Sequence, residues 1–356
     1  MLALLNSVKR IIPNWAKQWA IVIIAPASKR KDAREVARKF LGGEKPKERT
    51  IRKMLLCKYR LHVSYKEFFL LDCENRSLRS IGSFLTDTEL PSWVDRVNDY
   101  QYYELFQDKS KTFQKFSQYY GRELVVIADE TDFDSFRAFF MNHERGIVKP
   151  QNGYCGKGVE IIERSENPVQ QFSDLLHKYA EGGCVIEELI QQDPRLAIFN
   201  PSSLNTVRVT SFNTGSRVFL LSSFFRMGRK GKIVDNAHAG GISGVINEKS
   251  GEIIVASNLD SGCLFNAHPD SGVQLTHFVI PRWNEAVAMV TELAKSIPQV
   301  PYIGWDLALS TKGWLLVEAN YYAGISTPQV ALKKGLKSDF RKCIKEWQSN
   351  KTSCKI

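Results

Sequence analysis

Residues 302–320, YIGWDLALSTKGWLLVEAN, constrain the fold more than any other stretch, because two apolar runs there carry three oxygen-bearing side chains. Asp306 lies in the first run, and Glu318 and Asn320 lie in the second. The runs flank a short turn that contains a glycine, which is typical of a β-hairpin. We therefore expect two antiparallel strands that bring the three side chains to one place.

The length of the turn decides whether the two carboxylates share a face of this hairpin. A three-residue turn pairs Ser310 with Trp314 and places Asp306 directly opposite Glu318, whereas a two-residue turn places these carboxylates on opposite faces. Facing carboxylates repel each other. A divalent cation between them would reverse that effect, and magnesium prefers such oxygen ligands. The hairpin therefore predicts either a magnesium site or acids that merely face solvent.

Composition limits the class of protein. The chain has 356 residues, of which 43% are hydrophobic, enough for two or three lobes with cores of their own. The formal charge of +11 favours anionic partners. Seven cysteines without a CxxC pair argue against a disulfide framework or a zinc site. Since no recognised nucleic-acid module is present, we do not expect nucleic-acid binding.

The sequence also indicates where in the cell the protein is expected. No apolar run approaches the roughly 20 residues that span a bilayer, and the N-terminus lacks a clean signal peptide. We therefore expect a soluble, cytoplasmic protein. Residues 1–26 mix Leu, Ile and Trp with Lys and Arg. They could form an amphipathic helix on the inner membrane face, or a helix that docks on the protein's own body.

The hydrophobic pattern predicts an α+β fold with mostly antiparallel sheets. Residues 28–60 are basic and helical in pattern, with glycine and proline breakers between two segments; they form either a solvated face or a docking surface for an anionic partner. Strands are predicted at residues 124–128, 146–150, 159–162, 184–190, 205–212, 217–225, 244–247 and 251–257. Further helices are predicted at residues 132–142, 170–180 and 280–297 and at the C-terminus.

A second group of candidate residues lies in IVKPQNGYCGKGVEII, residues 147–162. Lys149 ends a predicted strand, and the glycine-rich turn that follows contains Gly153, Gly156 and Gly158. Glycines let backbone amides approach phosphate oxygens, and a strand lysine supplies a fixed positive charge. The turn therefore favours a phosphate loop, although an ordinary glycine-rich hairpin has the same pattern.

A third group lies in CVIEELIQQDP, where an apolar strand ends in two acids. The backbone of residues 187–190 could bind an adenine edge, and Gln192 or Asp193 could bind a ribose. Taken alone, the segment is an ordinary strand end. The order of the three groups along the chain is what gives them meaning.

That order resembles the ATP-grasp superfamily, and the segments NPSSLNTVRVTSF, NAHAGGISG, AHPDSG and VIPRWNEA narrow the resemblance to the sugar-transfer associated ATP-grasp family, which is related to α-L-glutamate ligases. The resemblance covers roughly residues 100–335. It implies an ATP-grasp fold, in which two α+β lobes clasp ATP, preceded by a mainly helical N-terminal region. The implied domains are 1–100 (basic helical region), 101–187 (first lobe), 188–340 (second lobe) and 341–356 (tail).

The resemblance also assigns residues to ATP and two magnesium ions. The nucleotide residues are Lys109, Lys149, Gly153, Gly156, Lys157, Gly158, Glu187, Glu188, Leu189, Ile190 and Asp193. The metal ligands are Asp306, Glu318 and Asn320. Arg208 and Arg226, in strand patterns, would bind a phosphate or carboxylate. Asn236 and His238 would act at the γ-phosphate or the acceptor, and for His238 a structural role is the alternative.

The activity that the resemblance implies is an ATP-dependent carboxylate–amine ligase that works through an acyl phosphate. A sugar acid such as a uronic acid, nucleotide-linked, lipid-linked or free, would be joined to an amino acid or other amine in bacterial surface polysaccharide biosynthesis. A kinase that phosphorylates a sugar hydroxyl would use the same ATP and metal residues, and a non-catalytic ATP-binding module is the third alternative. The sequence does not indicate an oligomeric state.

Overall fold

The structure, a computed structural model, describes residues 27–153, 158–232, 235 and 240–353. The chain divides into two compact units, a smaller one with residues 1–93 and 324–340 and a larger one with residues 94–323 and 341–356. Within the described ranges, no helix has both the length and the apolar character needed to cross a membrane. Five predicted features lie outside the described residues: the segment 1–26, Gly156, Lys157, Asn236 and His238.

The smaller unit is helical, and residues 28–60 within it have the helices that their pattern predicts. Its first two helices, α3 (Ala27–Phe40) and α4 (Glu48–Leu61), flank the predicted breakers, and Gly43 adopts a φ of +94° between them. The basic side chains lie on the outer faces, while Ala33, Ala37 and the apolar side of α4 are buried. The other elements are α5 (Tyr65–Leu70), η1 (Cys73–Asn75), α6 (Leu78–Ile81), α7 (Leu90–Val94, ending in the larger unit) and α14 (Ser326–Leu332).

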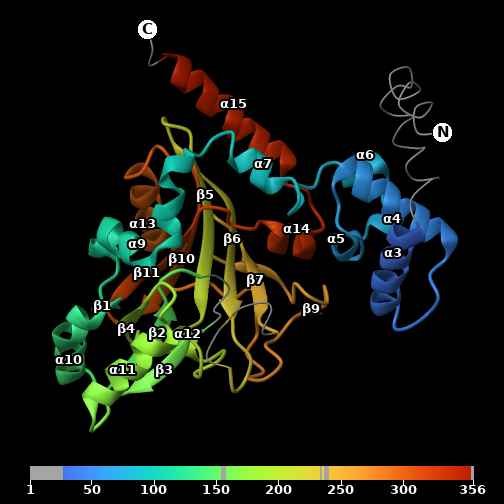
Figure 1. Ribbon diagram of the computed structural model, residues 1–356. Helices are drawn as coiled ribbons and strands as arrows, with labels where there is room; N and C mark the ends of the chain where they lie inside the picture. Colours follow the sequence, from blue (N-terminus) through green and yellow to red (C-terminus); the bar gives the residue numbers. More distant parts are fainter. Residues whose placement is uncertain (1–26, 154–157, 233–234, 236–239, 354–356) are drawn as a thin grey trace, which may run out of the picture. The chain divides into compact units, whose positions relative to one another are not determined.

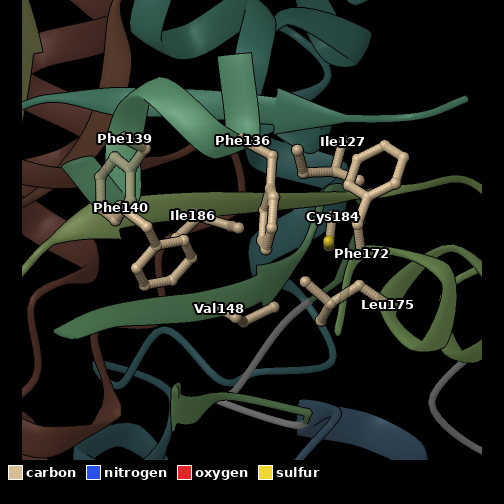
Figure 2. Packing of buried hydrophobic residues seen from close by; sticks show 9 residues of the cluster. All are labelled: Ile127, Phe136, Phe139, Phe140, Val148, Phe172, Leu175, Cys184 and Ile186. Atoms are coloured by element: carbon tan, nitrogen blue, oxygen red, sulfur yellow. The ribbon is translucent and has the colours of Figure 1, made fainter. Parts of the chain in front are cut away.

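The larger unit contains a four-stranded antiparallel sheet in the order β1–β4–β2–β3. Its strands are β1 (Leu124–Ile127), β2 (Arg145–Pro150), β3 (Glu160–Glu163) and β4 (Cys184–Glu188). Helices α10 (Phe133–Asn142) and α11 (Pro168–Lys178) lie beside this sheet (Figure 1). The core between them consists of Ile127, Phe136, Phe139, Phe140, Val148, Phe172, Leu175, Cys184 and Ile186 (Figure 2).

Truncation of Phe136 in this core is expected to destabilise the four-stranded sheet. Its ring is fully buried and contacts the rings of Phe140 and Phe172. Phe136→Ala should therefore cost about 3–5 kcal/mol of unfolding free energy, measured by urea denaturation. Met141, on the same helix, is 73% exposed, so Met141→Ala should change stability by no more than about 0.5 kcal/mol. Equal effects of the two substitutions would contradict this account of the core.

A second antiparallel sheet of the larger unit has seven strands in the order β11–β10–β5–β6–β7–β8–β9. The strands are β5 (Thr206–Asn213), β6 (Val218–Met227), β7 (Ile242–Ile246), β8 (Ile253–Ser257), β9 (Leu264–Phe265), β10 (Tyr302–Ser310) and β11 (Gly313–Asn320). Helix α13 (Trp283–Lys295) packs on this sheet with the apolar stripe of Trp283, Ala286, Met289, Val290 and Leu293. All of these strands except the short β9 coincide with strands or the hairpin expected from the sequence.

Short helices join and flank these sheets. They are η2 (Tyr100–Tyr102), α8 (Tyr103–Gln107), α9 (Lys109–Phe116), η3 (Ser117–Tyr119), η4 (Glu130–Asp132) and α12 (Pro194–Ala197), and the C-terminal helix is α15 (Lys337–Ser353). The fold class is confirmed: the chain is α+β, its sheets are antiparallel, and a helical region precedes them. The boundaries of the two ATP-grasp lobes stay a prediction.

Candidate active site

Three predicted site residues form one row across neighbouring strands of the seven-stranded sheet. Asp306 on β10 lies directly opposite Glu318 on β11. On its other side, Asp306 lies opposite Arg208 on β5. Because residues directly opposite each other project from the same face of a sheet, the three side chains share one face. The pairing of Asp306 with Glu318 is therefore confirmed.

The reason for this pairing differs from the expected one. The turn has two residues, since Ser310 pairs with Gly313, so the three-residue alternative with Ser310 opposite Trp314 does not hold. A two-residue turn alone would place the carboxylates on opposite faces. The register shifts between Asp306 and Leu307, where Val317 on the other strand has no partner. This β-bulge inserts one residue and returns Glu318 to the face of Asp306.

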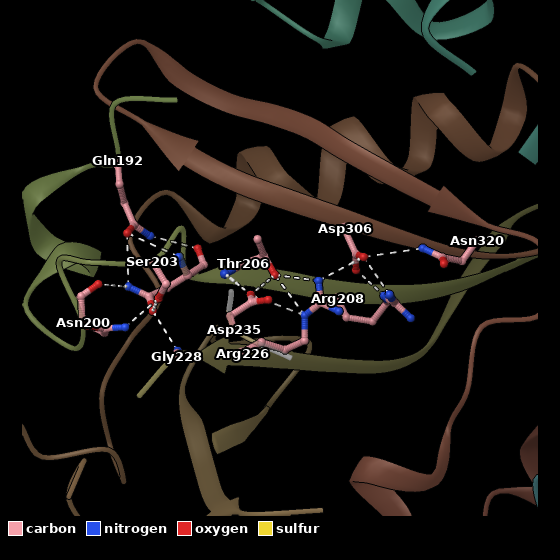
Figure 3. A network of polar contacts seen from close by, with 11 residues as sticks. Gln192, Asn200, Ser203, Thr206, Arg208, Arg226, Gly228, Asp235, Asp306 and Asn320 are labelled. Atoms are coloured by element: carbon pink, nitrogen blue, oxygen red, sulfur yellow. Dashed lines mark hydrogen bonds and ion pairs between the residues drawn. The ribbon is translucent and has the colours of Figure 1, made fainter. Parts of the chain in front are cut away.

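Two arginines bind the carboxylate of Asp306, which is only 2% exposed (Figure 3). Arg208 donates from both Nε and Nη2, the second bond measuring 2.6 Å. Nη2 of Arg226 lies 3.0 Å from Oδ2, the same oxygen that accepts from Nη2 of Arg208. Nδ2 of Asn320 donates to Oδ2 across 3.5 Å. Sequence analysis predicted all four residues for the site, and the structure places them together.

The two carboxylates experience opposite electrostatic effects. Burial raises the pKa of Asp306, but the charges of Arg208 and Arg226 outweigh burial and hold the pKa below its usual range. Burial raises the pKa of Glu318, and the neighbouring charge of Asp306 raises it further. Among the described residues, the side chain of Glu318 forms no hydrogen bond or ion pair.

These observations test whether the residues fit magnesium. The donor set consists of two carboxylates and an amide oxygen, and the Asn320 oxygen has no hydrogen bond within the described part of the chain. Such hard oxygen ligands suit Mg²⁺, which uses few carboxylates and takes its other ligands from phosphates and water. No larger group of acidic, histidine or cysteine side chains able to hold a metal occurs in the described ranges. The row therefore fits magnesium bound together with phosphates.

The predicted strand lysine is fixed by a buried carboxylate. Nζ of Lys149, near the end of β2, lies 2.8 Å from Oε1 of Glu187 on β4. The other carboxylate oxygen accepts from Arg122, whose Nη2 is 2.6 Å away. Burial raises the pKa of Glu187, but the charges of Arg122 and Lys149 lower it to about 2. The Glu187 side chain therefore positions Lys149, a role that the sequence did not indicate.

Sequence reasoning missed Arg122 altogether. Besides binding Glu187, its Nη1 donates to the carbonyl of Leu316 at 2.7 Å, and its Nη2 reaches the carbonyl of Val317 at 3.5 Å. These carbonyls belong to the bulge that sets the Asp306–Glu318 register. Arg122 precedes β1 in the run RELVV, which offers no local signal of such a role.

Lys109 lies close to the same charges. It begins α9, where the carboxylate of Asp108 caps the helix, and its Nζ donates to the carbonyl of Gly153 at 3.1 Å. The pKa of Lys109 lies below its usual value, chiefly because the side chain is buried. The negative charge of Glu318 opposes this shift, and the positive charge of Lys149 adds to it. The structure thus brings both predicted lysines close enough to Glu318 for their charges to act on it, and Lys109 also contacts the start of the glycine turn.

The described part of the glycine turn has the backbone that only glycine adopts readily. Gly158 has a φ of +72°, and a Cβ there would lie 2.9 Å from the Pro150 side chain. Gly153 has a φ of +154°. Both positions are consistent with a backbone that approaches a ligand closely.

The predicted adenine segment follows β4. The backbone groups of Leu189 and Ile190 form no hydrogen bonds among the described residues, so they are available to a nucleobase edge. Glu188 accepts from the amide of Glu123 at 3.2 Å. Asp193 caps α12 and binds Arg195 at 2.7 Å, so its carboxylate is already engaged within the protein. Its contact with a ribose stays a prediction.

A buried carboxylate that sequence analysis did not single out completes the network. Asp235 accepts hydrogen bonds from the amide and the hydroxyl of Thr206, and it lies 3.6 Å from Nε of Arg226. Asp235 lies between Val234 and Asn236 in the polar segment whose Asn236 and His238 fall outside the described residues, so their roles stay predictions. Asn205, just before β5, donates to Oε1 of Gln192 and to the carbonyls of Leu196 and Asn200, so its role is structural.

A protein whose antiparallel sheets bring two lysines, a glycine turn and a carboxylate–carboxylate–amide set together has the features of the ATP-grasp superfamily. The model of the sugar-transfer associated ATP-grasp family matches residues 91–345, and the chain belongs to that family. No curated protein sequence matches the chain.

Solved structures show distant similarity. The ATP-grasp ligase PsnB, complexed with a minimal precursor, Mg and ADP, is 12% identical, with a TM-score of 0.41 over 76% of this chain and 69% of that chain. For N5-carboxyaminoimidazole synthetase from Staphylococcus aureus the values are 12%, 0.41, 68% and 52%. For D-alanyl-alanine synthetase A from Vibrio cholerae they are 9%, 0.44, 68% and 65%. The chain thus spans about half to two thirds of these proteins' lengths.

Replacement of Lys149 is expected to weaken nucleotide binding. Lys149→Met removes a fixed charge beside the glycine turn while Glu187 keeps Arg122 as a partner. A charge-assisted hydrogen bond to phosphate is worth about 1.5–3 kcal/mol, so ADP should bind about 10- to 100-fold more weakly by calorimetry. Lys178→Met removes a lysine that pairs with Glu160 on the same sheet, and its ADP affinity should stay unchanged. Equal ADP affinity of Lys149→Met and the unmodified protein would remove Lys149 from the site.

Proposed function

We propose that this protein is an ATP-dependent carboxylate–amine ligase. The γ-phosphoryl group of ATP moves to a substrate carboxylate to form an acyl phosphate, and an amine then displaces phosphate to form an amide. The observation that carries the proposal is the row of Glu318, Asp306 and Arg208 across three strands. Phosphoryl transfer needs this combination of oxygen ligands for a cation and positive charge for the transferred group.

The chain's own residues bind and orient the reactants in this proposal. Lys149, held by Glu187, and Lys109, at the start of α9, offset the negative charge of the phosphates. Arg226 and Arg208 lie on the same face of the sheet and provide forks that match a phosphate or carboxylate bidentately. Their rigid attachment to paired strands means that orientation costs little at the moment of reaction.

Magnesium has a defined place in the proposal. Asp306, Glu318 and Asn320 would hold two magnesium ions. The ions would act as Lewis acids and neutralise the charge on the phosphate oxygens. The backbone of Leu189 and Ile190 would bind the adenine edge. The glycine turn that begins at Gly153 would cover the phosphates.

The substrates form the finer part of the proposal. The family name refers to sugar transfer, so we propose a sugar acid, such as a nucleotide-linked or lipid-linked uronic acid, as the carboxylate and an amino acid as the amine. The net charge of +11 suits such anionic substrates. The family name and the positive charge are both consistent with a role in the synthesis of a surface polysaccharide. That synthesis would take place on the cytoplasmic side of the membrane, with peripheral contact through residues 1–26.

The test is phosphate release by the purified full-length protein with ATP and magnesium. Uronic acids linked to nucleotides or lipids would be screened in pairs with amino acids. A ligase releases phosphate only when acid and amine are both present. A phosphorylated sugar as product would instead identify a kinase, and absence of ADP formation with every pair, despite measurable ATP binding, would identify a non-catalytic binding module.

A further inference from the structure

Arg226 is shared between two buried carboxylates. Its Nη2 lies 3.0 Å from Asp306, and its Nε lies 3.6 Å from Asp235 (Figure 3). The same guanidinium donates from Nε and Nη2 to the hydroxyl of Thr206, at 2.9 and 2.8 Å. The Thr206 hydroxyl in turn donates to Asp235. Arg226 is therefore fixed by a carboxylate and a hydroxyl that do not belong to the metal row.

Arg208 has no such second attachment. Among the described residues, its guanidinium bonds only to Asp306. Both arginines thus neutralise the same carboxylate, but among the described residues Arg226 alone of the two also forms an ion pair with a second one. A cation that binds Asp306 must compete with both arginines for its oxygens, because each of them is a positive charge in contact with that ligand.

Asp235 bears on how strongly Arg226 competes with a cation for the oxygens of Asp306. Because it is a buried carboxylate near Arg226, it offsets part of the guanidinium charge that would otherwise rest on Asp306 alone. Through the hydroxyl of Thr206, it also gives Arg226 an attachment that does not depend on Asp306. Thr206 and Asp235 are therefore connected to Asp306 through Arg226.

We propose that Asp235 is a positioning residue that shares Arg226 with Asp306, so that Asp306 can bind magnesium while Arg226 keeps its place. This inference rests on the proposed function, since it assumes that Asp306 is a metal ligand. Without Asp235, Arg226 would keep its ion pair with Asp306 alone, and its charge would exclude the cation from that carboxylate. The residue therefore controls magnesium affinity rather than the chemical step itself.

The experiment is a calorimetric titration of the full-length protein with Mg²⁺ in the presence of saturating ADP. Asp235→Asn should bind Mg²⁺ about 10-fold more weakly, the lower end of the 10- to 100-fold loss typical of residues that orient metal ligands. In an Arg226→Gln background, adding Asp235→Asn should change Mg²⁺ affinity less than about twofold, because the residue through which Asp235 acts is absent. An equal loss in both backgrounds, or no loss in either, would overturn the proposal.

A matched control is provided by the Arg229–Asp270 pair, whose two hydrogen bonds measure 2.6 and 2.9 Å and which does not contact Asp306. Asp270→Asn should leave Mg²⁺ affinity unchanged, so a general effect of breaking an arginine–aspartate pair would be recognised. If Asp235→Asn does not fold, Thr206→Val removes the hydroxyl between Arg226 and Asp235 and keeps the carboxylate. It should weaken Mg²⁺ binding in the same direction, and again only when Arg226 is present; unchanged affinity would contradict the proposal.

The result also separates this inference from the proposed function. If the unmodified protein binds no Mg²⁺ with ADP, the metal assignment and the proposed function fail together. If it binds Mg²⁺ and the affinity of Asp235→Asn equals that of the unmodified protein, only the role of Asp235 is wrong.

Discussion

Replacing Glu318 with glutamine is expected to reduce ATP turnover by on the order of 10²–10³-fold, the loss that follows removal of about 3–4 kcal/mol of transition-state stabilisation. Glu318 lies opposite Asp306, and in the described residues its side chain has no other partner. The amide keeps the shape and one oxygen, but it removes the charge that would hold a divalent cation. ADP formation is the measurement, with the protein saturated in ATP and magnesium.

The fold should survive this substitution, because the carboxylate of Glu318 is disfavoured where it lies. Burial and Asp306 both raise its pKa, so a neutral amide relieves repulsion, and the melting temperature should stay the same or rise. Glu285→Gln is the matched control, since Glu285 is an exposed carboxylate on α13 that pairs with Arg282. Turnover by Glu318→Gln equal to that of the control would contradict the metal assignment.

Replacing Arg122 with leucine is expected to lower the unfolding free energy by about 3–5 kcal/mol, the usual cost of breaking a buried ion pair by removing one partner. The Arg122 and Glu187 side chains are 2% and 3% exposed. The substitution leaves Glu187 with Lys149 alone and leaves the bulge carbonyls of Leu316 and Val317 without their donor. Urea denaturation measures the loss.

Activity should fall with stability, because the bulge sets the register of Asp306 and Glu318. ATP turnover measured below the unfolding temperature should decrease by at least about 10-fold, as for residues that orient metal ligands. Arg145→Leu breaks an exposed pair with Glu163 that spans 3.4 Å and should cost at most about 1 kcal/mol. A folded Arg122→Leu protein with full turnover would show that the bulge is stable without this arginine.

The pH dependence of stability gives the Arg122 variant a second readout. The pKa of Glu187 is about 2 in the folded protein, below the unfolded value of about 4.3. Its contribution to stability is therefore present above about pH 4.3 and is lost as the pH falls towards 2. Removal of Arg122 raises the folded pKa and reduces this contribution, so acid unfolding should begin at a higher pH than in the unmodified protein.

Much of the fold and of the candidate site could be predicted because the signals are local. Alternating and apolar runs give the strands and α13, and glycine and proline breakers separate α3 from α4. The site residues Lys149, Asp306, Glu318 and Asn320 could be found because a charged or amide side chain in an apolar strand is costly unless it is hydrogen-bonded, paired or bound to a metal. The structure brings Lys109, Arg208 and Arg226 to the same place.

The remaining features depend on contacts between residues far apart in the chain. Asp235 and Thr206 are common residue types that the sequence did not single out, and only their contacts with Arg226 indicate a role. The same applies to Glu187, whose side chain positions Lys149 while its position in the sequence indicated a nucleotide contact.

The sequence by itself therefore determined the hairpin and the identity of its oxygen-bearing side chains, because period-two patterns and turn residues act over a few positions. Only the tertiary structure decided that Asp306 faces Glu318. The two-residue turn alone would separate them, and the bulge at Val317 restores the pairing. The carbonyls of this bulge bond to Arg122, 194 residues before Leu316 in the chain. A backbone carbonyl that loses its hydrogen bond to the neighbouring strand needs another donor. The local sequence does not specify a donor that lies so far away in the chain.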